Sequence, residues 1–546
     1  MTKTSQNRAL LLNLGAITVL SAVSSIVFKL SLAYRDPISS DFSIYIEIAK
    51  GLSLNPATYD PLGAWPLGYP LALRALSFLE NWHYAGAAIS FMSLLAVSIA
   101  SFYILRTGFG FLSSFIGSLS ILINSSIITW SVGHSSDMPS LAMAFVSIAF
   151  FLAWRRTGSA KTLLVAGACT GLSYLFRYSS LSLLFSLLLL IILLAMSLQL
   201  QKHTRHIDRS ALLGRYLLIF IGGWIIAASP QLVGSWLVHG NPLYNENGCN
   251  VALAIGWRKN IPGLTWANVK DVFPACKSLS SVIYNQPFEF FKNLLLNFRE
   301  SLLIMRFSII VFVGSVAVFF MASRKDPHFF NASRGVAITI FVIGVMNATF
   351  ISLAFVSDRH LILSSSLLNC FGFAALVECV LNPRLRKSLL DRYYMLFAFV
   401  AVAIVGTLEI QRGLHSISLY RYMSARTLKS LKVKSVLLSY KCRDAQAAPN
   451  EIDALLIGDN FVDPDNYKAI GHQAWRKDYK PFSNPLNTSS WMRANSFNCV
   501  IVDEHSLSGR LPGFDLGAWK QEYNRKRSFK GAWKLPRSET YVFILD

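Results

Sequence analysis

Long apolar runs constrain this chain more than any other feature of its sequence. About eleven stretches of roughly 18 or more mainly apolar residues lie between residues 9 and 411, and each is long enough to cross a bilayer as a helix. Only 15% of the residues are charged and the mean hydropathy is +0.44, which excludes a multidomain soluble chain and a disordered one. We therefore predict an all-α polytopic membrane protein with helices at 9–33, 84–105, 110–130, 138–154, 162–177, 180–198, 216–237, 301–322, 335–356, 360–380 and 392–411.

The basic residues of the short loops predict the orientation. Lysine and arginine gather in every second loop, beginning with Lys3 and Arg8, whereas the alternate loops hold almost none besides Arg177 and Arg359. Since such residues stay on the cytoplasmic side, we expect a cytoplasmic N-terminus, a retained first anchor and an extracytoplasmic C-terminus in a cell (inner or plasma) membrane. This distribution and contacts with anionic membrane lipids also account for the net charge of +22, and no basic run with interleaved aromatic residues indicates nucleic acid.

Three long segments fall on the expected outer side. Residues 34–83 and 238–300 form two loops of a transmembrane module that spans 1–411, and residues 412–546 are long enough for a small extracytoplasmic domain. Strand-like runs in this tail alternate with polar, proline-bearing stretches, which indicates an α/β module with strands at 435–439, 454–458, 499–503 and 540–545. Acceptor binding and bracing of the second loop both fit such a tail.

The seven cysteines fit this topology. Three lie in expected spans, where cysteine acts as a small apolar residue: Cys169, Cys370 and Cys379. The other four form pairs within outer segments, Cys249 with Cys276 and Cys442 with Cys499. Two disulfides in an oxidising compartment and four unpaired thiols both agree with this arrangement.

Charges that depart from the basic-inside pattern mark candidate functional residues. On the outer side they come from different helices at one membrane level: Asp36, Asp41, Asp137, Arg177, Asp358 and Arg359 with His360. Acids and arginines that converge there favour an outward-facing pocket for an anionic, lipid-borne substrate. Since no cluster of histidines and acids has the spacing of a metal site, we expect no metal and no other cofactor.

The first outer loop holds two motifs. Residues 41–52 carry apolar side chains at helical spacing, which predicts an amphipathic helix on the membrane surface that begins at Asp41 and includes Tyr45 and Glu47. Residues 65–70, with Tyr69, form a Pro/Gly turn before a second helix. Each motif has a structural alternative: Asp41 caps its helix, and the turn anchors aromatic rings at the membrane interface.

These motifs resemble those of a known family. Asp-x3-Tyr-x2-Ile-Ala-x-Gly-Leu from Asp41 and Pro-Leu-Gly-Tyr-Pro-Leu from Pro66 look like the first outer loop of GT-C glycosyltransferases, in particular the protein O-mannosyltransferase and lipid A aminoarabinose transferase group (glycosyltransferase family 39-like). Further similar motifs follow in order at 135–141, 167–177, 230 with 240–243, and 358–361. Two positions depart from the pattern: Phe42 stands where relatives often carry a second acid, and His360 replaces the usual tyrosine.

The resemblance implies a reaction and a set of roles. In that family a sugar moves, with inversion, from a polyprenyl-phosphate donor to an acceptor hydroxyl of a glycan, lipid or protein at the outer membrane face. Asp41 would then be the general base. Arg359 and Arg177 would bind the donor phosphate, with Arg258 and Lys259 from the second loop. The other pocket candidates are Tyr45, Glu47, Tyr69, Asp137 and His360.

Several assignments have alternatives. Arg177 equally suits a snorkelling interfacial residue, and Arg359 suits an ion pair with Asp358. The position of Asp137 favours a cap of the fourth span. For the whole chain, the alternatives are a transporter or flippase of lipid-linked saccharide and a non-catalytic assembly subunit. Because the helix midpoints are nearly free of charge, whereas transporters bind their substrates near the midplane, the sequence favours the enzyme.

Overall fold

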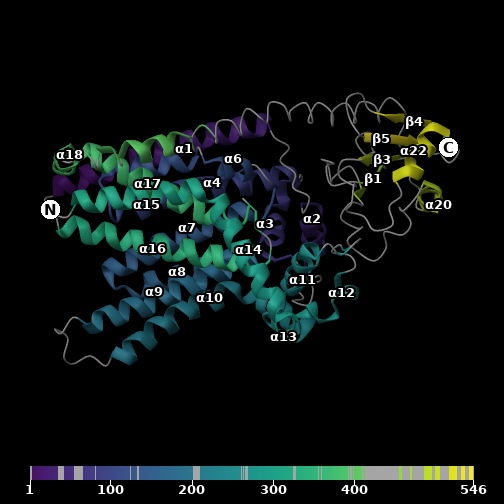
Figure 1. The fold of residues 1–546 in the computed structure, drawn as a ribbon, viewed down its shortest axis with the longest axis horizontal. Helices are drawn as coiled ribbons and strands as arrows, with labels where there is room; N and C mark the ends of the chain where they lie inside the picture. Colours follow the sequence, from purple (N-terminus) through teal and green to yellow (C-terminus); the bar gives the residue numbers. More distant parts are fainter. Residues whose placement is uncertain are drawn as a thin grey trace. The chain divides into compact units, whose positions relative to one another are not determined.

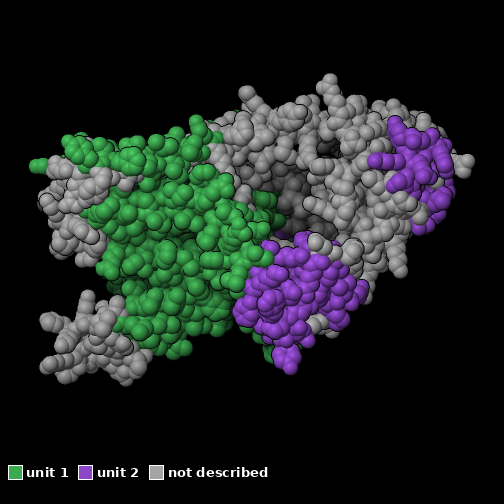
Figure 2. Space-filling model, in the orientation of Figure 1, with its two compact units in different colours: residues 1–34, 51–244, 294–420 green, residues 35–50, 245–293, 421–546 purple. Residues whose placement is uncertain are grey.

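Two compact units make up the chain, and the apolar helices belong to the first, which comprises residues 1–34, 51–244 and 294–420 (Figures 1 and 2). The computed structural model describes residues 3–34, 42–53, 65–79, 82–122, 124–131, 134–200, 209–259, 261, 264, 269–323, 327–354, 356–357 and 359–390, scattered positions from 393 to 411, and the helices and strands named below between 454 and 544.

Seven described helices are long and apolar enough to cross a membrane: α1 (Lys3–Tyr34), α4 (Trp82–Arg106), α7 (Asp137–Thr157), α9 (Leu181–Leu200), α10 (Arg209–His239), α16 (Pro327–Ile351) and α17 (Ile362–Leu381). Two further helices, α14 (Pro287–Ile304) and α15 (Arg306–Ser323), are long and apolar enough only when taken together, and the chain bends by 69° between them. The helices α15, α16 and α17 lie side by side (Figure 1). The protein is thus a polytopic α-helical membrane protein with seven, or eight, candidate spans among its described residues.

The expectation of about eleven full-length spans is too high for the described residues, because three apolar runs form shorter helices. The run at 110–130 is split into α5 (Phe111–Leu122) and α6 (Ser125–Trp130), since the Asn124 side chain accepts backbone hydrogen bonds from the first turn of α6 at 3.0 and 3.3 Å. The helix α8 (Ala160–Phe176) has 17 residues, and the described part of 392–411 includes an apolar helix at Phe399–Leu408.

Glycines let α8 and α10 pack backbone against backbone. A Cβ atom on Gly167 or Gly171 of α8 would meet a carbonyl oxygen of α10, and one on Gly223 of α10 would meet the carbonyl oxygen of Leu164. Between helices in a membrane, such close approach supplies dispersion contacts in place of a hydrophobic driving force. Because α8 also packs along α7, its end at Phe176 is held by two neighbours.

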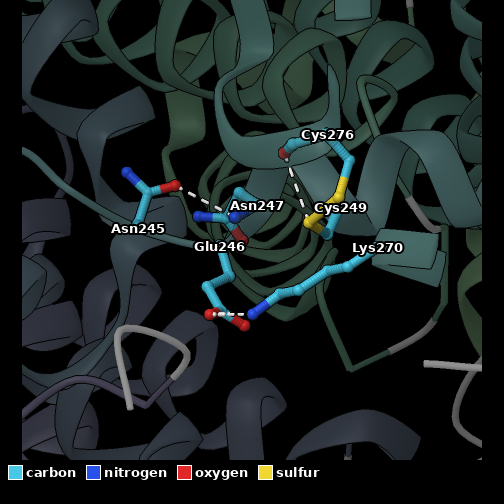
Figure 3. The surroundings of a disulfide bond; sticks show 6 residues. All are labelled: Asn245, Glu246, Asn247, Cys249, Lys270 and Cys276. Carbon is cyan, nitrogen blue, oxygen red and sulfur yellow. Dashed lines mark hydrogen bonds and ion pairs between the residues drawn. A yellow bond between two sulfur atoms is a disulfide. The ribbon is translucent and has the colours of Figure 1, made fainter. Parts of the chain in front are cut away.

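The second unit comprises residues 35–50, 245–293 and 421–546 (Figure 2). Its helices include α2 (Phe42–Gly51), α11 (Asn247–Arg258), α12 (Val269–Val272) and α13 (Leu279–Asn285). A disulfide joins Cys249 of α11 to Cys276 of the short 3-10 helix η4 (Pro274–Lys277), and beside it Lys270 Nζ lies 2.6 Å from Glu246 Oε1 (Figure 3). One of the two cysteine pairs is therefore bonded, whereas Cys442 of the other pair lies outside the described residues.

The C-terminal region contains a five-stranded sheet in the order β2-β1-β3-β5-β4. Its strands are β1 (Ala454–Ile457), β2 (Lys468–Ala469), β3 (Cys499–Asp503), β4 (Gly531–Lys534) and β5 (Thr540–Ile544); β1 is parallel to β2 and β3, and β5 is antiparallel to β3 and β4. Two helices accompany it, α20 (Pro485–Ala494) and α22 (Leu516–Arg525). Three of the four runs expected to be strands are strands. The fourth run, 435–439, and the domain boundary expected after residue 411 fall at residues 412–453, which lie outside the described residues.

Candidate functional site

A buried carboxylate joins two arginines from distant segments of the first unit. The side chain of Asp137 is 1% exposed and forms ion pairs with Arg177 and with Arg359, whose Nε donates to Asp137 Oδ2 at 2.6 Å. The side chains of the two arginines are 18% and 21% exposed. Three of the outer charged residues that were expected to converge therefore lie in one cluster.

The interpretation of Asp137 as a helix cap is wrong. Asp137 is the first residue of α7 itself, and its carboxylate accepts hydrogen bonds from Arg359 and from the Ser135 hydroxyl at 2.8 Å. A carboxylate so deeply buried is strongly destabilising unless charged partners compensate it, and the two arginines provide that compensation. Asp358, the partner that the sequence offered for Arg359, lies outside the described residues.

Arg177 ends α8 because its backbone is extended, with φ −150° and ψ 128°. Three hydroxyl groups tie α7, the last turn of α8 and the 3-10 helix η3 (Tyr178–Ser180) together at oxygen–oxygen distances of 2.8–3.1 Å: Ser140, Ser173 and Ser180. Since Arg177 lies between α8 and η3, this network fixes the origin of its side chain. A mostly buried side chain paired with Asp137 does not fit the snorkelling alternative.

Arg359 and His360 lie in the turn before α17. The guanidinium carbon of Arg359 is 5.1 Å from the centre of the Trp130 ring, a cation–π contact. His360 Nδ1 is 2.9 Å from the Ser357 hydroxyl. Burial, together with the positive charges of Arg177 and Arg359, lowers the pKa of His360 well below its ordinary value of 6.5, so the ring is neutral at pH 7.

A glutamine that the sequence analysis missed connects the first-loop turn to this region. Gln231 of α10 is fully buried; its Oε1 accepts the backbone N–H of Leu67 at 2.8 Å, and its Nε2 donates to the Tyr178 hydroxyl at 3.0 Å. The available signal was a polar residue directly after Pro230 inside an apolar run, since a polar side chain at membrane depth requires a partner.

The turn that Gln231 holds leads into α3 (Gly68–Ala75), and the predicted Tyr69 is the second residue of this helix and is fully buried. Gly68 lies against the backbone of α8, where a Cβ atom would be 2.6 Å from the carbonyl oxygen of Leu175. No larger residue fits there without displacing the backbone. The motif at 65–70 therefore packs against Leu175, two positions before Arg177 in the sequence.

The other predicted residues of the first outer loop fall in or beside α2. Asp41, the predicted base, lies outside the described residues. The helix expected over 41–52 is described as α2 from Phe42, and its expected position on the membrane surface stays a prediction. Tyr45 is buried in the second unit, and Glu47 is placed only as a backbone position of α2.

The predicted basic residues of the second loop contact α14. Arg258 Nε donates to Asn293 Oδ1 at 2.7 Å, and Lys259 Nζ lies 3.6 Å from Glu289 Oε1. Both interactions lie within the second unit. Asn293 is 1% exposed, so it provides a fixed anchor for the Arg258 guanidinium.

The cluster of Asp137, Arg177 and Arg359 has the chemistry of an anion site. Two guanidinium groups and one carboxylate give these three side chains one net positive charge. Each guanidinium presents a planar fork of N–H donors that matches the oxygens of a phosphate. Among the residues that the structure describes, no group of three histidine, cysteine or acidic side chains could hold a metal ion.

Comparisons with known proteins bear on the fold. No family model and no curated protein matches the sequence. Among solved structures, ArnT from Cupriavidus metallidurans bound to undecaprenyl phosphate aligns with 97% of this chain and 98% of its own, at 13% identity and a TM-score of 0.51. The oligosaccharyltransferase AglB from Archaeoglobus fulgidus, in complex with an inhibitory peptide and a dolichol-phosphate, aligns with 88% of this chain and 69% of its own, at 11% identity and a TM-score of 0.42.

A protein O-mannosyltransferase complex of S. cerevisiae bound to the sugar donor aligns with 45% of this chain and 36% of its own, at 12% identity and a TM-score of 0.33. All three proteins are GT-C glycosyltransferases. The alignment with ArnT covers nearly the whole of both chains, so it concerns the complete architecture rather than one helical bundle. The chain therefore has the fold of the GT-C glycosyltransferases, as the resemblance of its motifs predicted.

Proposed function

We propose that this protein is a multi-pass glycosyltransferase that moves a sugar from a polyprenyl-phosphate donor to an acceptor hydroxyl, with inversion at the anomeric carbon. The observation that carries this proposal is the pairing of Arg177 and Arg359 with one buried acid, Asp137. The fold shared with ArnT, whose structure holds undecaprenyl phosphate, supports the same class of donor.

The proposed roles follow from the chemistry of the reaction. The leaving group is a lipid phosphate that is already anionic, so it needs charge stabilisation and no proton donor. Arg177 and Arg359 supply that stabilisation, and Asp137 keeps both guanidinium groups oriented before the donor arrives, so little reorganisation is needed. The bond from the anomeric carbon to phosphate oxygen breaks as the acceptor oxygen attacks from the opposite face.

The acceptor hydroxyl needs a base, and Asp41 in the first-loop motif is our assignment. A carboxylate within about 3 Å of the hydroxyl takes its proton and typically contributes about 10²–10⁴-fold to the rate. The assignment comes from the resemblance of residues 41–52 to the family motif.

We place the reaction on the extracytoplasmic side of a cell membrane. Arg177 and Arg359 lie in turns that the distribution of basic residues assigns to that side. The disulfide of the second loop, predicted to be on the same side, agrees because such bonds persist in oxidising compartments.

A flippase or transporter of lipid-linked saccharide is the second candidate, since a cationic cluster for lipid phosphate would serve it as well. The position of the cluster favours the enzyme. Asp137 is the first residue of α7, and the two arginines lie in turns before α9 and α17 rather than inside spans. Transporters place such groups near the bilayer midplane.

Purified protein in lipid nanodiscs, supplied with undecaprenyl-phosphate sugars and candidate acceptors, tests the proposal. We expect Asp41→Asn to reduce transfer by about 100-fold or more without weakening binding of undecaprenyl phosphate. Arg359→Ala should reduce both transfer and binding. The control is Arg386→Ala, because Arg386 is exposed on α18 (Pro383–Leu390) and should leave both unchanged.

Three outcomes would count against the assignments. Unchanged transfer by Asp41→Asn removes the base, and unchanged binding by Arg359→Ala removes the phosphate site. Movement of the lipid-linked sugar across the bilayer without transfer to any acceptor favours the flippase.

A further inference from the structure

The helix α14 carries polar residues on its buried face and large apolar residues on its exposed face. The buried residues are Phe290 at 4%, Asn293 at 1%, Asn297 at 3% and Ser301 at 0% exposure. The exposed residues are Phe288 at 75%, Phe291 at 56%, Leu295 at 69% and Leu302 at 42%. Both sets recur at helical spacing, so they occupy two faces of one helix. A surface helix in water has the reverse arrangement.

The polar face of α14 forms hydrogen bonds with the rest of the protein, so it cannot be turned outward without breaking them. Asn297 Nδ2 donates to the carbonyl oxygens of Ser352 and Ala354 at 3.0 and 2.7 Å. The hydroxyl groups of Ser301 and Ser352 are 3.1 Å apart. Rotating α14 to bury its apolar stripe would break these bonds and leave buried polar groups unpaired, so the stripe must be covered from outside.

We propose that the exposed stripe of α14 (Phe288, Phe291, Leu295 and Leu302) lies against the acyl chains of the bilayer, which makes α14 a membrane-embedded helix and not part of a water-exposed loop. The α14–α15 pair as a whole is long and apolar enough to enter a membrane. Exposed apolar residues also continue beyond the 69° bend into α15, with Ile310 at 46% and Val313 at 53%. A helix satisfies its own backbone hydrogen bonds, as the lipid environment demands.

The two basic residues of α14 agree with these surroundings. Lys292 and Arg299 are exposed, and both have long aliphatic stems that can lie along apolar surface while the charged ends reach the phosphate headgroups. A bent helix close to the headgroup level allows this geometry. The proposal moves residues 287–300, which the sequence assigned to the outer loop 238–300, into the membrane.

The embedded helix has a consequence for the cluster of Asp137, Arg177 and Arg359. Through Asn297, α14 holds the backbone of the segment that leads to Arg359, so lipid contact on one face of α14 supports the segment from the other face. Only this consequence rests on the proposed function. The embedding itself rests on burial, on hydrogen bonding and on the apolar length of the α14–α15 pair.

Two adjacent phenylalanines, one buried and one exposed, provide the test. The full chain is prepared with Phe291→p-benzoylphenylalanine or, as the matched control, Phe290→p-benzoylphenylalanine, and is reconstituted in vesicles of phosphatidylethanolamine and phosphatidylglycerol. We expect irradiation to attach phospholipid at position 291, at least ten times more than at position 290. A third variant, Leu295→p-benzoylphenylalanine, should behave like the first and serves if the first fails to fold.

One pattern of adducts supports the proposal and three others contradict it. Lipid adducts at 291 and 295 with few at 290 support the proposal. No adduct at 291 and 295 would mean that the stripe faces water, adducts with another polypeptide would mean that it is a protein interface, and equal lipid adducts at 290 would mean that the faces are wrongly assigned. Each of these three results overturns the proposal.

Discussion

Asp137 serves as the counter-ion of Arg177 and Arg359 at the same time, so its charge has a larger effect than that of a surface acid. In Asp137→Asn the two guanidinium groups keep their positive charges and lose the carboxylate between them. We expect a loss of stability of about 3 kcal/mol, at the low end for a broken buried ion pair because both arginines are about a fifth exposed. Thermal unfolding of the purified variant measures this loss, and Ser135→Ala, which removes one hydrogen bond from an uncharged donor to the same carboxylate, is the control. Equal losses in the two variants would contradict the ion-pair account.

His360 gives the cluster a predictable response to pH. Its pKa is lowered in the folded protein, whereas in the unfolded chain it has the ordinary value of 6.5. As pH falls below about 6.5 the unfolded state therefore binds a proton before the folded state does, and the free energy of unfolding falls. Above that pH this contribution no longer changes. We expect the melting temperature to fall less between pH 7.5 and pH 5.5 in His360→Gln than in the wild type, and an identical fall would refute the assignment.

For the residues of the cluster, the sequence predicted which side chains are important better than it predicted their contacts. Arg177, Arg359 and Asp137 were identifiable because each departs from the expected charge pattern of a membrane protein. Their pairing with one another was not identifiable, since it depends on how α7, α8 and α17 pack. In the sequence, the position of Asp137 at the start of a helix is also typical of a capping residue. Gln231 was missed because its two partners are remote in sequence, and one of them is a backbone N–H.

Two adjacent glycines of α10 test the contact between α8 and α10. Gly223 of α10 faces the backbone of α8, whereas a Cβ atom on Gly222 would meet nothing within 4 Å. We expect Gly223→Ala to destabilise the protein by about 1–3 kcal/mol through overpacking. Gly222→Ala should be neutral or stabilise by up to about 1 kcal/mol, because alanine favours the helix. Melting temperatures that fall equally in both variants would show that the helices do not meet at Gly223.

Most helices could be placed from apolar runs, and the exceptions have local causes. The run at 110–130 was predicted as one span because its mean hydropathy stays high despite Asn124, whose side chain caps a new helix. The helix α14 reads as a loop because its charges lower its hydropathy, and the sequence alone does not say that Asn293 and Asn297 face inward. Which side of a helix meets protein is a property of packing, not of composition.

For the whole molecule, the disulfide between Cys249 and Cys276 links topology to chemistry. In intact cells carrying Cys442→Ser and Cys499→Ser, we expect a membrane-impermeant maleimide to label the second loop only after an impermeant reductant is added, because the bond forms outside the cytoplasm. The thiols of Cys169, Cys370 and Cys379 lie within the apolar helices α8 and α17, which an impermeant reagent does not enter, so they should stay unlabelled throughout. Labelling before reduction would mean that the bond is absent.

The pairing at Asp137 also limits how such a protein can be redesigned. Because Asp137 pairs with arginines from two remote parts of the chain, a change at either arginine also disturbs the other. An engineer who wanted this scaffold to accept a neutral leaving group would have to replace residues in three segments together, and intermediates on that route would carry an uncompensated charge inside the bundle. Natural variation should therefore alter the three positions as a set.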